Sequence, residues 1–239
     1  MYGYRARIGY TSPPLITEVF AYEFYKMAPE GVTLMLTTLA LTTRSKEEVA
    51  KSFEMSLEAA HKMAKAGASM VMLGGNPISL IHGGSDLAAF EAKMSQDVGI
   101  PVTTSTTAQT KALRLLGSRK VATAHPYESG HNERMEKSIS AFGFEPVGAL
   151  ACDYNFLGLG SVPAGMALTL ARCLKAEHPE ADTIHFGSAH WATAHVLDQV
   201  ERELGVSVMS SQQAIFWHAL RTAGVEDRIP GYGRLLREF

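Results

Sequence analysis

Three stretches from the first half of the chain recur, in the same order, in the second half, and this repetition restricts the fold more than any other feature. The matching pairs are Ile8–Pro14 with Val121–Tyr127, Leu73–Gly75 with Phe186–Ser188, and Gly99–Ser105 with Gly205–Ser211. The first two pairs are both 113 positions apart and the third is 106 positions apart. One such match could arise by chance, but three in register indicate a duplicated unit.

Short apolar runs alternate with longer amphipathic ones along the whole chain. Strict alternation of this kind predicts an α/β fold with parallel sheets. Ser45, with two glutamates soon after it, is a suitable N-cap for one of the helices. The expected strands are Arg7–Tyr10, Val32–Leu36, Met70–Leu73, Pro101–Thr103, Lys120–Thr123, Glu145–Ala151, Thr183–Phe186 and Ser207–Met209. The expected helices are Leu15–Met27, Ser45–Ala66, Thr106–Leu116, Glu128–Phe142, Ala164–Glu177, Ala192–Leu204 and Gln212–Thr222, and a loop is expected to begin within Leu39–Thr43.

The repetition predicts two pseudo-symmetric halves, each with a roughly four-stranded parallel sheet flanked by helices. We assign residues 1–117 and 213–239 to the first half and residues 118–212 to the second. Ligands of open α/β sheets bind beyond the carboxyl ends of the strands. If those ends face each other, a ligand cleft lies between the halves.

Composition excludes several classes of function. A formal net charge of −2 gives no reason to expect nucleic acid as a partner, since binding it usually requires a basic face. No run approaches 18 consecutive apolar residues, so no membrane span is expected. The start of the chain lacks a signal-peptide pattern, and two cysteines make no disulfide framework, so a cytoplasmic protein is the default. The glycine-rich turns match no nucleotide-binding motif.

The residues that follow the strands are the candidates for chemistry, because they gather at one edge of each sheet. These turns are Thr11–Pro14, Gly74–Pro77, Thr104–Thr107, His125–Tyr127, Gly187–His190 and Ser210–Gln212. Most are rich in Ser, Thr, Asn or Gly, which offer neutral donors suited to a carboxylate. The alternative for any single turn is that its hydroxyl only caps the following helix.

The turn after the strand Ile184–Phe186 is a candidate anion-binding turn. Small residues there are expected to lead into a helix near Trp191, and the N–H groups of a helix N-terminus attract anions. His185, inside the strand, is expected to be a hydrogen-bonded structural residue. His190 and His125 directly follow strand ends and are better placed to move a proton. Tyr127 could donate its phenol to a ligand or only pack.

The spacing of the histidines does not predict a metal site. His185, His190 and His195 are five positions apart, which neither aligns them on one helix face nor matches a standard ligand pattern. Cys152 and Cys173 are separated in the chain and are expected in the core.

Taken together, the paired turns resemble the aspartate/glutamate racemase superfamily over nearly the whole chain, and within it the arylmalonate decarboxylases more than the maleate cis-trans isomerases. The resemblance rests on the segments Ile8–Pro14, Pro101–Ala108, Tyr127 with Asn132–Arg134, Val200–Val206 and Pro230–Leu235. It implies two flavodoxin-like halves, no cofactor, and a small carboxylic acid as partner. It leaves the oligomeric state open, a homo-oligomer included.

The resemblance also implies a chemistry that this chain has altered. In the family, cysteines after the third strand of each half act on the substrate, and the decarboxylases keep only the second. Here these positions are Gly75 and Ser188. The implied reaction forms an enediolate that neutral donors stabilise while an apolar pocket expels carbon dioxide. A serine is a far weaker acid than a thiol, so it could bind the carboxylate, or relay a proton if His190 or His125 lay beside it.

Three hypotheses follow. The first is a cofactor-independent lyase or isomerase acting on a small dicarboxylic or related acid through an enediolate, with a non-cysteine proton donor. The second is a carboxylate-binding protein without turnover, and the third a metal-assisted hydrolase or hydratase. The catalytic candidates are Ser188, His190, His125 and Tyr127, and the substrate-binding candidates are Ser12, Pro14, Gly75, Asn76, Tyr127, Ser188 and Ala189; no metal ligand is assigned.

Overall fold

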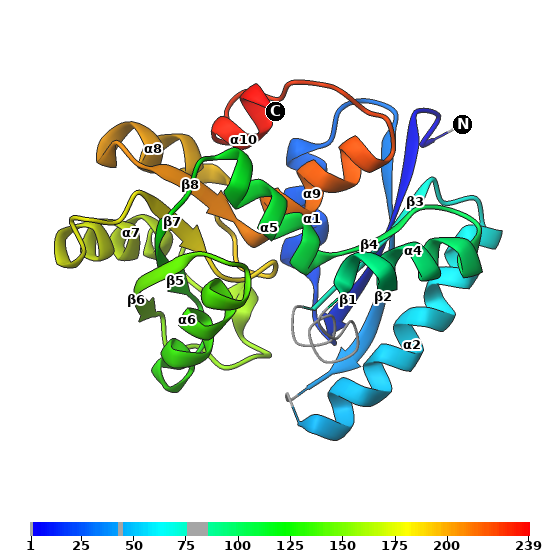
Figure 1. Ribbon diagram of the computed structural model, residues 1–239, viewed down its shortest axis with the longest axis horizontal. Helices are drawn as coiled ribbons and strands as arrows, with labels where there is room; N and C mark the ends of the chain where they lie inside the picture. Colours follow the sequence, from blue (N-terminus) through cyan, green and yellow to red (C-terminus); the bar gives the residue numbers. More distant parts are fainter. Residues whose placement is uncertain (1, 43–44, 76–85) are drawn as a thin grey trace. The chain divides into compact units, whose positions relative to one another are not determined.

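A computed structural model describes residues 2–42, 45–75 and 86–239 (Figure 1). The chain forms two compact units. Unit 1 comprises residues 1–108 and 215–227, and unit 2 comprises residues 109–214 and 228–239. This division differs from the expected one in that residues 109–117, 213–214 and 228–239 belong with the second unit.

Unit 1 contains a four-stranded parallel sheet in the order β2-β1-β3-β4. Its strands are β1 (Ala6–Pro14), β2 (Val32–Leu41), β3 (Met70–Leu73) and β4 (Val102–Thr104). Its helices are α1 (Glu18–Met27), α2 (Lys46–Lys65), α4 (Leu87–Val98) and the start of α5 (Ser105–Leu115). The Ser45 hydroxyl accepts a hydrogen bond from the backbone N–H of Glu48, which confirms the predicted cap of α2.

Unit 2 repeats the plan with the sheet order β6-β5-β7-β8. Its strands are β5 (Lys120–His125), β6 (Glu145–Ala151), β7 (Thr183–Phe186) and β8 (Ser207–Ser210). Its helices are α6 (Asn132–Ala141), α7 (Met166–Glu177), α8 (Leu197–Leu204), the start of α9 (Ser211–Thr222) and α10 (Arg234–Glu238), with short 3₁₀ turns at Ser129–His131, Leu159–Ser161 and Ala194–Val196.

The register of strand pairing confirms the duplication read from the sequence. In unit 1, Ile8 pairs with Met70, and 113 positions later Val121 pairs with Thr183. The outer strands repeat at the other spacing: β4 aligns Thr104 with Leu73 as β8 aligns Ser210 with Phe186. Two hydrogen bonds repeat as well, since Gly74 N–H donates to the Thr11 carbonyl and Gly187 N–H to the Ala124 carbonyl.

Several boundaries differ from the sequence expectation. β1 continues through Pro14 and β2 through Leu41, because a register shift near Ala40, which has a φ of 56°, lets the pairing resume. The loop expected within Leu39–Thr43 is therefore mostly strand. Helix α4 was not expected, although Asp86 caps it through the Ala89 N–H and Gly99 ends it in the left-handed region.

In each unit, one face of the central strands carries an apolar core. Alternate residues of a strand point to opposite faces. In unit 1, Val71 and Leu73 of β3 pack with residues of α2 and α4. In unit 2, the equivalent Ile184 and Phe186 of β7 pack with residues of α7 and α8.

The C-terminal segment is held to unit 2 by backbone and side-chain hydrogen bonds. The backbone N–H of Arg234 donates to both carboxylate oxygens of Glu201, and that of Gly233 donates to Asp198. The Arg234 guanidinium reaches the Leu116 carbonyl at 2.7 Å. These contacts explain why residues 228–239 group with the second unit and not, as expected, with the first.

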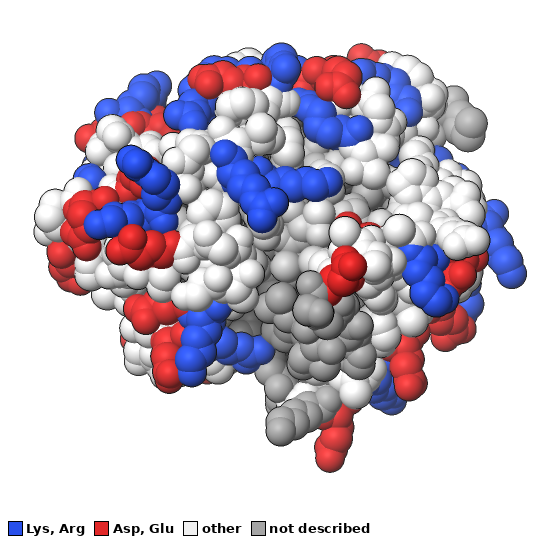
Figure 2. Space-filling model, viewed as in Figure 1, with Lys and Arg blue, Asp and Glu red and all other residues white. Residues whose placement is uncertain are grey.

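On the face shown in Figure 2, Lys and Arg side chains lie among Asp and Glu side chains, in keeping with the small net charge. Across the described part of the chain, no helix is long and apolar enough to cross a membrane.

Candidate active site

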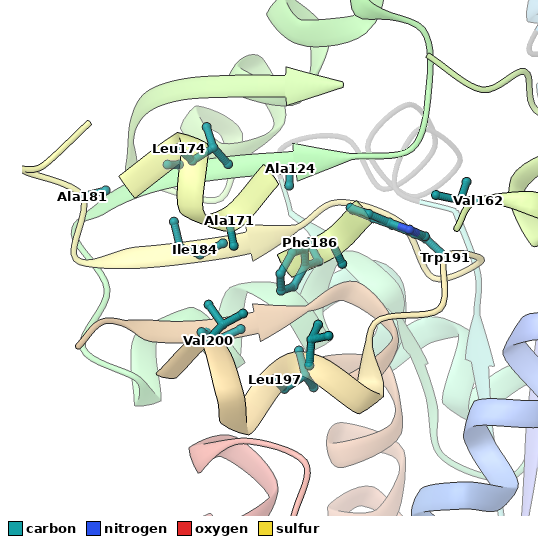
Figure 3. Packing of buried hydrophobic residues seen from close by; sticks show 14 residues of the cluster. Ala124, Val162, Ala171, Leu174, Ala181, Ile184, Phe186, Trp191, Leu197 and Val200 are labelled. Carbon is teal, nitrogen blue, oxygen red and sulfur yellow. The ribbon is translucent and has the colours of Figure 1, made fainter. Parts of the chain in front are cut away.

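The turn after β7 departs from the expected strand-to-helix junction. No helix begins near Trp191; a 3₁₀ turn intervenes and α8 starts only at Leu197. Trp191 is instead buried, its ring meeting that of Phe186 edge-on with centroids 5.6 Å apart (Figure 3). The indole anchors the turn in the apolar core, so the donors of this turn are local groups and not a helix N-terminus.

Ser188 lies at the centre of this turn, with only 4% of its surface exposed. Its Oγ accepts a hydrogen bond from the Tyr127 hydroxyl at 3.1 Å and another from the backbone N–H of His190, also at 3.1 Å. Between them, the Ala189 N–H donates to no acceptor in the described part of the chain. The turn thus offers one hydroxyl and one open amide for an incoming carboxylate.

Tyr127 reaches Ser188 from the end of β5. It follows that strand by two residues and is buried, with 7% exposed. Its ring lies 6.4 Å from that of Phe156 and 6.1 Å from that of His131, centroid to centroid. Packing on its ring and a hydrogen bond at its hydroxyl together fix the phenol in position.

The two candidate histidines differ in their surroundings. His125, the last residue of β5, is fully buried, and its Nε2 lies 2.8 Å from Oδ1 of Asn132 at the start of α6. Its ring is 5.8 Å from that of Tyr127. His190 meets Ser188 through its backbone N–H. The structure therefore brings His125, Tyr127, Ser188 and His190 together at the adjacent ends of β5 and β7.

His185 is a buried structural residue, as predicted. Its Nδ1 lies 3.3 Å from Oγ1 of Thr123 and its Nε2 lies 3.2 Å from Oγ of Ser211. Ser211 in turn donates toward Oε1 of Gln109 and the carbonyl oxygen of Phe186. Burial, with a smaller contribution from the charge of His125, lowers the pKa of His185 to about 3. His185 is therefore neutral at physiological pH.

The evenly spaced histidines serve different partners. Nε2 of His195 lies 2.9 Å from the carbonyl oxygen of Ala164, whereas the ring of His185 bonds to Thr123 and Ser211. Among the residues that the structure describes, no three His, Cys, Asp or Glu side chains gather as metal ligands would.

The candidates in unit 1 lie at the corresponding strand ends. Ser12 is fully buried within β1, and its hydroxyl is 2.8 Å from that of Thr17. Pro14 is the last residue of β1, paired with Leu41. Gly75 follows β3 with a φ of 95°, and Asn76 lies outside the described residues.

Neither cysteine lies at a turn after the third strand of a unit. Cys152 directly follows β6 and is half-buried; burial, then the charge of Asp153, raises the pKa of its thiol to about 12. Cys173 is exposed on α7, so the expectation that it is a core residue is wrong.

Two groups near the site are not predicted from the sequence. Asn132 orients His125, and the ring of His131 borders Tyr127. Asn132 was visible only as part of a shared motif, and its hydrogen bond depends on how α6 packs on β5. Nothing in the spacing of His131 distinguishes it from a surface residue of a helix start.

The chain is similar in sequence to known enzymes that act on small carboxylic acids. Residues 8–236 match the arylmalonate decarboxylase family. Arylmalonate decarboxylase of Bordetella bronchiseptica is 35% identical over 192 residues, covering 77% of this chain and 78% of the relative. Maleate isomerase of Nocardia farcinica is 28% identical over 138 residues, covering 57% of this chain and 55% of the relative.

A solved structure matches over nearly the full length. It is a liganded double mutant of arylmalonate decarboxylase, in which one glycine is changed to cysteine and one cysteine to serine. The two chains superpose with a TM-score of 0.87 at 30% identity, covering 98% of this chain and 100% of the other. The paired four-stranded parallel sheets thus match a known enzyme fold, and the chain belongs to the arylmalonate decarboxylase family.

Proposed function

We propose that the protein is a cofactor-independent, decarboxylase-type lyase acting on a small dicarboxylic acid through an enediolate-type intermediate. Family membership supports a decarboxylase or an isomerase of small carboxylic acids. The observation that carries the more specific proposal is the hydrogen bond from Tyr127 to Ser188, beside the open N–H of Ala189. These are neutral donors at one point, as an anionic intermediate requires.

In the proposed reaction, the substrate keeps one carboxylate and loses the other as carbon dioxide. The retained carboxylate lies against the Ser188 hydroxyl and the Ala189 N–H, and Tyr127, whose hydroxyl donates to Ser188, holds that serine in position. As the second carboxylate leaves, its bonding electron pair moves into the retained group, which becomes the enediolate. Donors already held in place stabilise that charge without reorganising, which is worth about 10²–10³ in rate for each donor.

The corresponding unit 1 residues Ser12, Pro14, Gly75 and Asn76 are proposed to contribute to substrate binding. The proton that completes the product comes from a hydroxyl or imidazole at the ends of β5 and β7, with Ser188, Tyr127, His190 and His125 as the candidates. No metal or cofactor has a part in these steps.

The test is turnover of a panel of acids: malonate, alkylmalonates, arylmalonates and maleate. Proton NMR in deuterated water would identify each product, and the expected result is carbon dioxide release with one deuterium in the product. The Ala189→Pro variant, which removes the N–H, should lose at least about 100-fold in rate. Conversion of maleate without gas release would instead establish the isomerase. Tight binding of an acid, seen as thermal stabilisation, without any product would establish the binding protein and contradict the proposal.

A further inference from the structure

The hydrogen bonds of Ser188 have a definite direction. A serine hydroxyl has one hydrogen to donate and two lone pairs to accept. At Ser188 the Tyr127 hydroxyl and the His190 N–H both donate to Oγ. Both bonds use the oxygen as acceptor, so the hydrogen of Ser188 is left to point toward a third group.

Two donors on one oxygen also change its acidity. Hydrogen bonds to the charged form of a group favour ionisation. Ser188 is buried, with 4% of the residue exposed, so water competes little with either donor. If the hydroxyl gave up its proton, the alkoxide would keep the amide bond of His190 and could take the proton of Tyr127 along the existing hydrogen bond.

We propose that Ser188 is the proton donor of the reaction and that Tyr127 restores its proton, a two-residue relay that takes the place of the family cysteine. This assignment rests on the proposed decarboxylation. The electron pair of the enediolate takes the proton from Oγ of Ser188 and forms the new C–H bond. The Tyr127 O–H breaks as the Ser188 O–H reforms, and solvent water returns a proton to the phenolate.

The surrounding groups favour this relay over the other proton sources. The imidazole of His125 is engaged with Asn132, and its ring lies beside that of Tyr127, where it can assist the phenol but does not bond to Ser188. His185 is neutral and enclosed by Thr123 and Ser211. A phenol is also a stronger acid than an aliphatic alcohol, so the Tyr127 hydroxyl can supply a proton to the alkoxide.

A double-mutant cycle separates a relay from simple binding. In the wild-type background, Tyr127→Phe should lower kcat by about 100-fold or more while KM changes little. A thiol is acidic enough to donate without help. In the Ser188→Cys background, therefore, the same Tyr127→Phe change should cost less than about 10-fold. Tyr22→Phe, on the exposed side of α1, and Ser140→Cys, exposed on α6, serve as controls.

The isotope dependence of the rate gives an independent reading. In mixtures of light and heavy water, the wild type should show a curved dependence that reports two protons in flight, and the Ser188→Cys variant a linear one. Equal losses from Tyr127→Phe in both backgrounds would show that Tyr127 only binds, and would overturn the relay alone. Full activity of Ser188→Ala would assign the donor elsewhere, for instance to His190. No turnover of any acid by either wild type or Ser188→Cys would overturn the proposed function, and the relay with it.

Discussion

The two units place different side chains at the same point of the same sheet. In unit 1, Tyr10 of β1 pairs with Met72 of β3. In unit 2, the equivalent Thr123 of β5 pairs with His185 of β7. The tyrosine stacks on Phe20 with ring centroids 4.0 Å apart, whereas the threonine and histidine join a chain of hydrogen bonds.

This difference shows that a duplicated fold can keep one backbone arrangement while its two copies carry different buried side chains. Strand pairing and the bond from each glycine to the neighbouring strand are the same in both units, so the backbone accepts either filling. The apolar filling needs no partner, while the polar one is stable only because each buried group is bonded. The polar network belongs to the unit that carries Ser188, and its His185 is a residue of β7, the strand that leads to Ser188.

The largest expected difference is at the equivalent glycines Gly74 and Gly187. A Cβ at Gly74 would lie 2.2 Å from the Thr11 carbonyl oxygen, whereas one at Gly187 would meet nothing closer than Cγ2 of Thr123 at 3.1 Å. Gly74→Ala should therefore lower the free energy of unfolding by at least about 3 kcal/mol, and Gly187→Ala by less than about 1 kcal/mol. Urea denaturation measures both; equal effects would mean that the two turns do not differ as described.

A second experiment gives unit 2 the apolar filling of unit 1. His185→Met removes the partner of the Thr123 hydroxyl and should cost about 1–3 kcal/mol of stability. Adding Thr123→Val removes the orphaned hydroxyl and should recover about 1 kcal/mol. The reciprocal change Met72→His, which buries an imidazole beside Tyr10, serves as the comparison and should be at least as costly as His185→Met. A double mutant no more stable than His185→Met would contradict this account.

The acidity of His185 predicts how stability changes with pH. In the unfolded chain its imidazole has a pKa near 6.5, whereas burial lowers the pKa to about 3 in the fold. Between these pH values His185 is protonated in the unfolded chain and neutral in the folded chain. The contribution of His185 to stability is therefore fully present above about pH 6.5 and is lost as the pH falls toward 3. Denaturation midpoints from pH 7 to pH 4 should fall less steeply for His185→Met than for wild type. Parallel curves would show that another group governs the acid response.

The smallest effect is expected from thiol reagents, because neither Gly75 nor Ser188 has a thiol. Iodoacetamide near neutral pH should label Cys173, which is exposed, and spare Cys152, whose thiol pKa is raised to about 12. Turnover should remain within about twofold of that of the untreated protein, since neither thiol is hydrogen-bonded to a site residue in the described part of the chain. Peptide mapping with a parallel assay measures both. Loss of activity in step with labelling of Cys152 would require a thiol in the reaction.

Most of the fold could be predicted from the sequence because duplication constrains it twice. A strand that is ambiguous in one half, such as Met70–Leu73, has a clearer copy in the other half. The observed register of strand pairing repeats at the same spacing as the sequence matches. Even the Ser45 cap follows from local chemistry. The incorrect predictions were local as well: β1 continues through Pro13 and Pro14, and β2 continues past Ala40 at positive φ, because a register shift accommodates these residues.

The site could be predicted only in part. The turns that hold Tyr127 and Ser188 were identifiable as strand ends, but the hydrogen bond between them is a tertiary contact over 61 positions. The helix expected near Trp191 does not form there, because burying the indole against Phe186 stabilises a turn that leads away from helical geometry. The sequence pattern shows that Trp191 is apolar, but it does not show whether this residue begins a helix or packs into the core from a turn.

The path of the chain through the two units has a consequence for synthesis. Residues 215–227 complete unit 1 and residues 228–239 complete unit 2, so both units are built from segments that are distant along the chain. During translation, the sheet of unit 1 can form early. Unit 1 nevertheless lacks its part of α9 until more than a hundred further residues have been added. The arginine-rich segment that bonds to Asp198 and Glu201 emerges only after the residues that complete unit 1. A ribosome that stalls before residue 215 would therefore release two unfinished units and no independent domain, which makes truncated products targets for proteolysis.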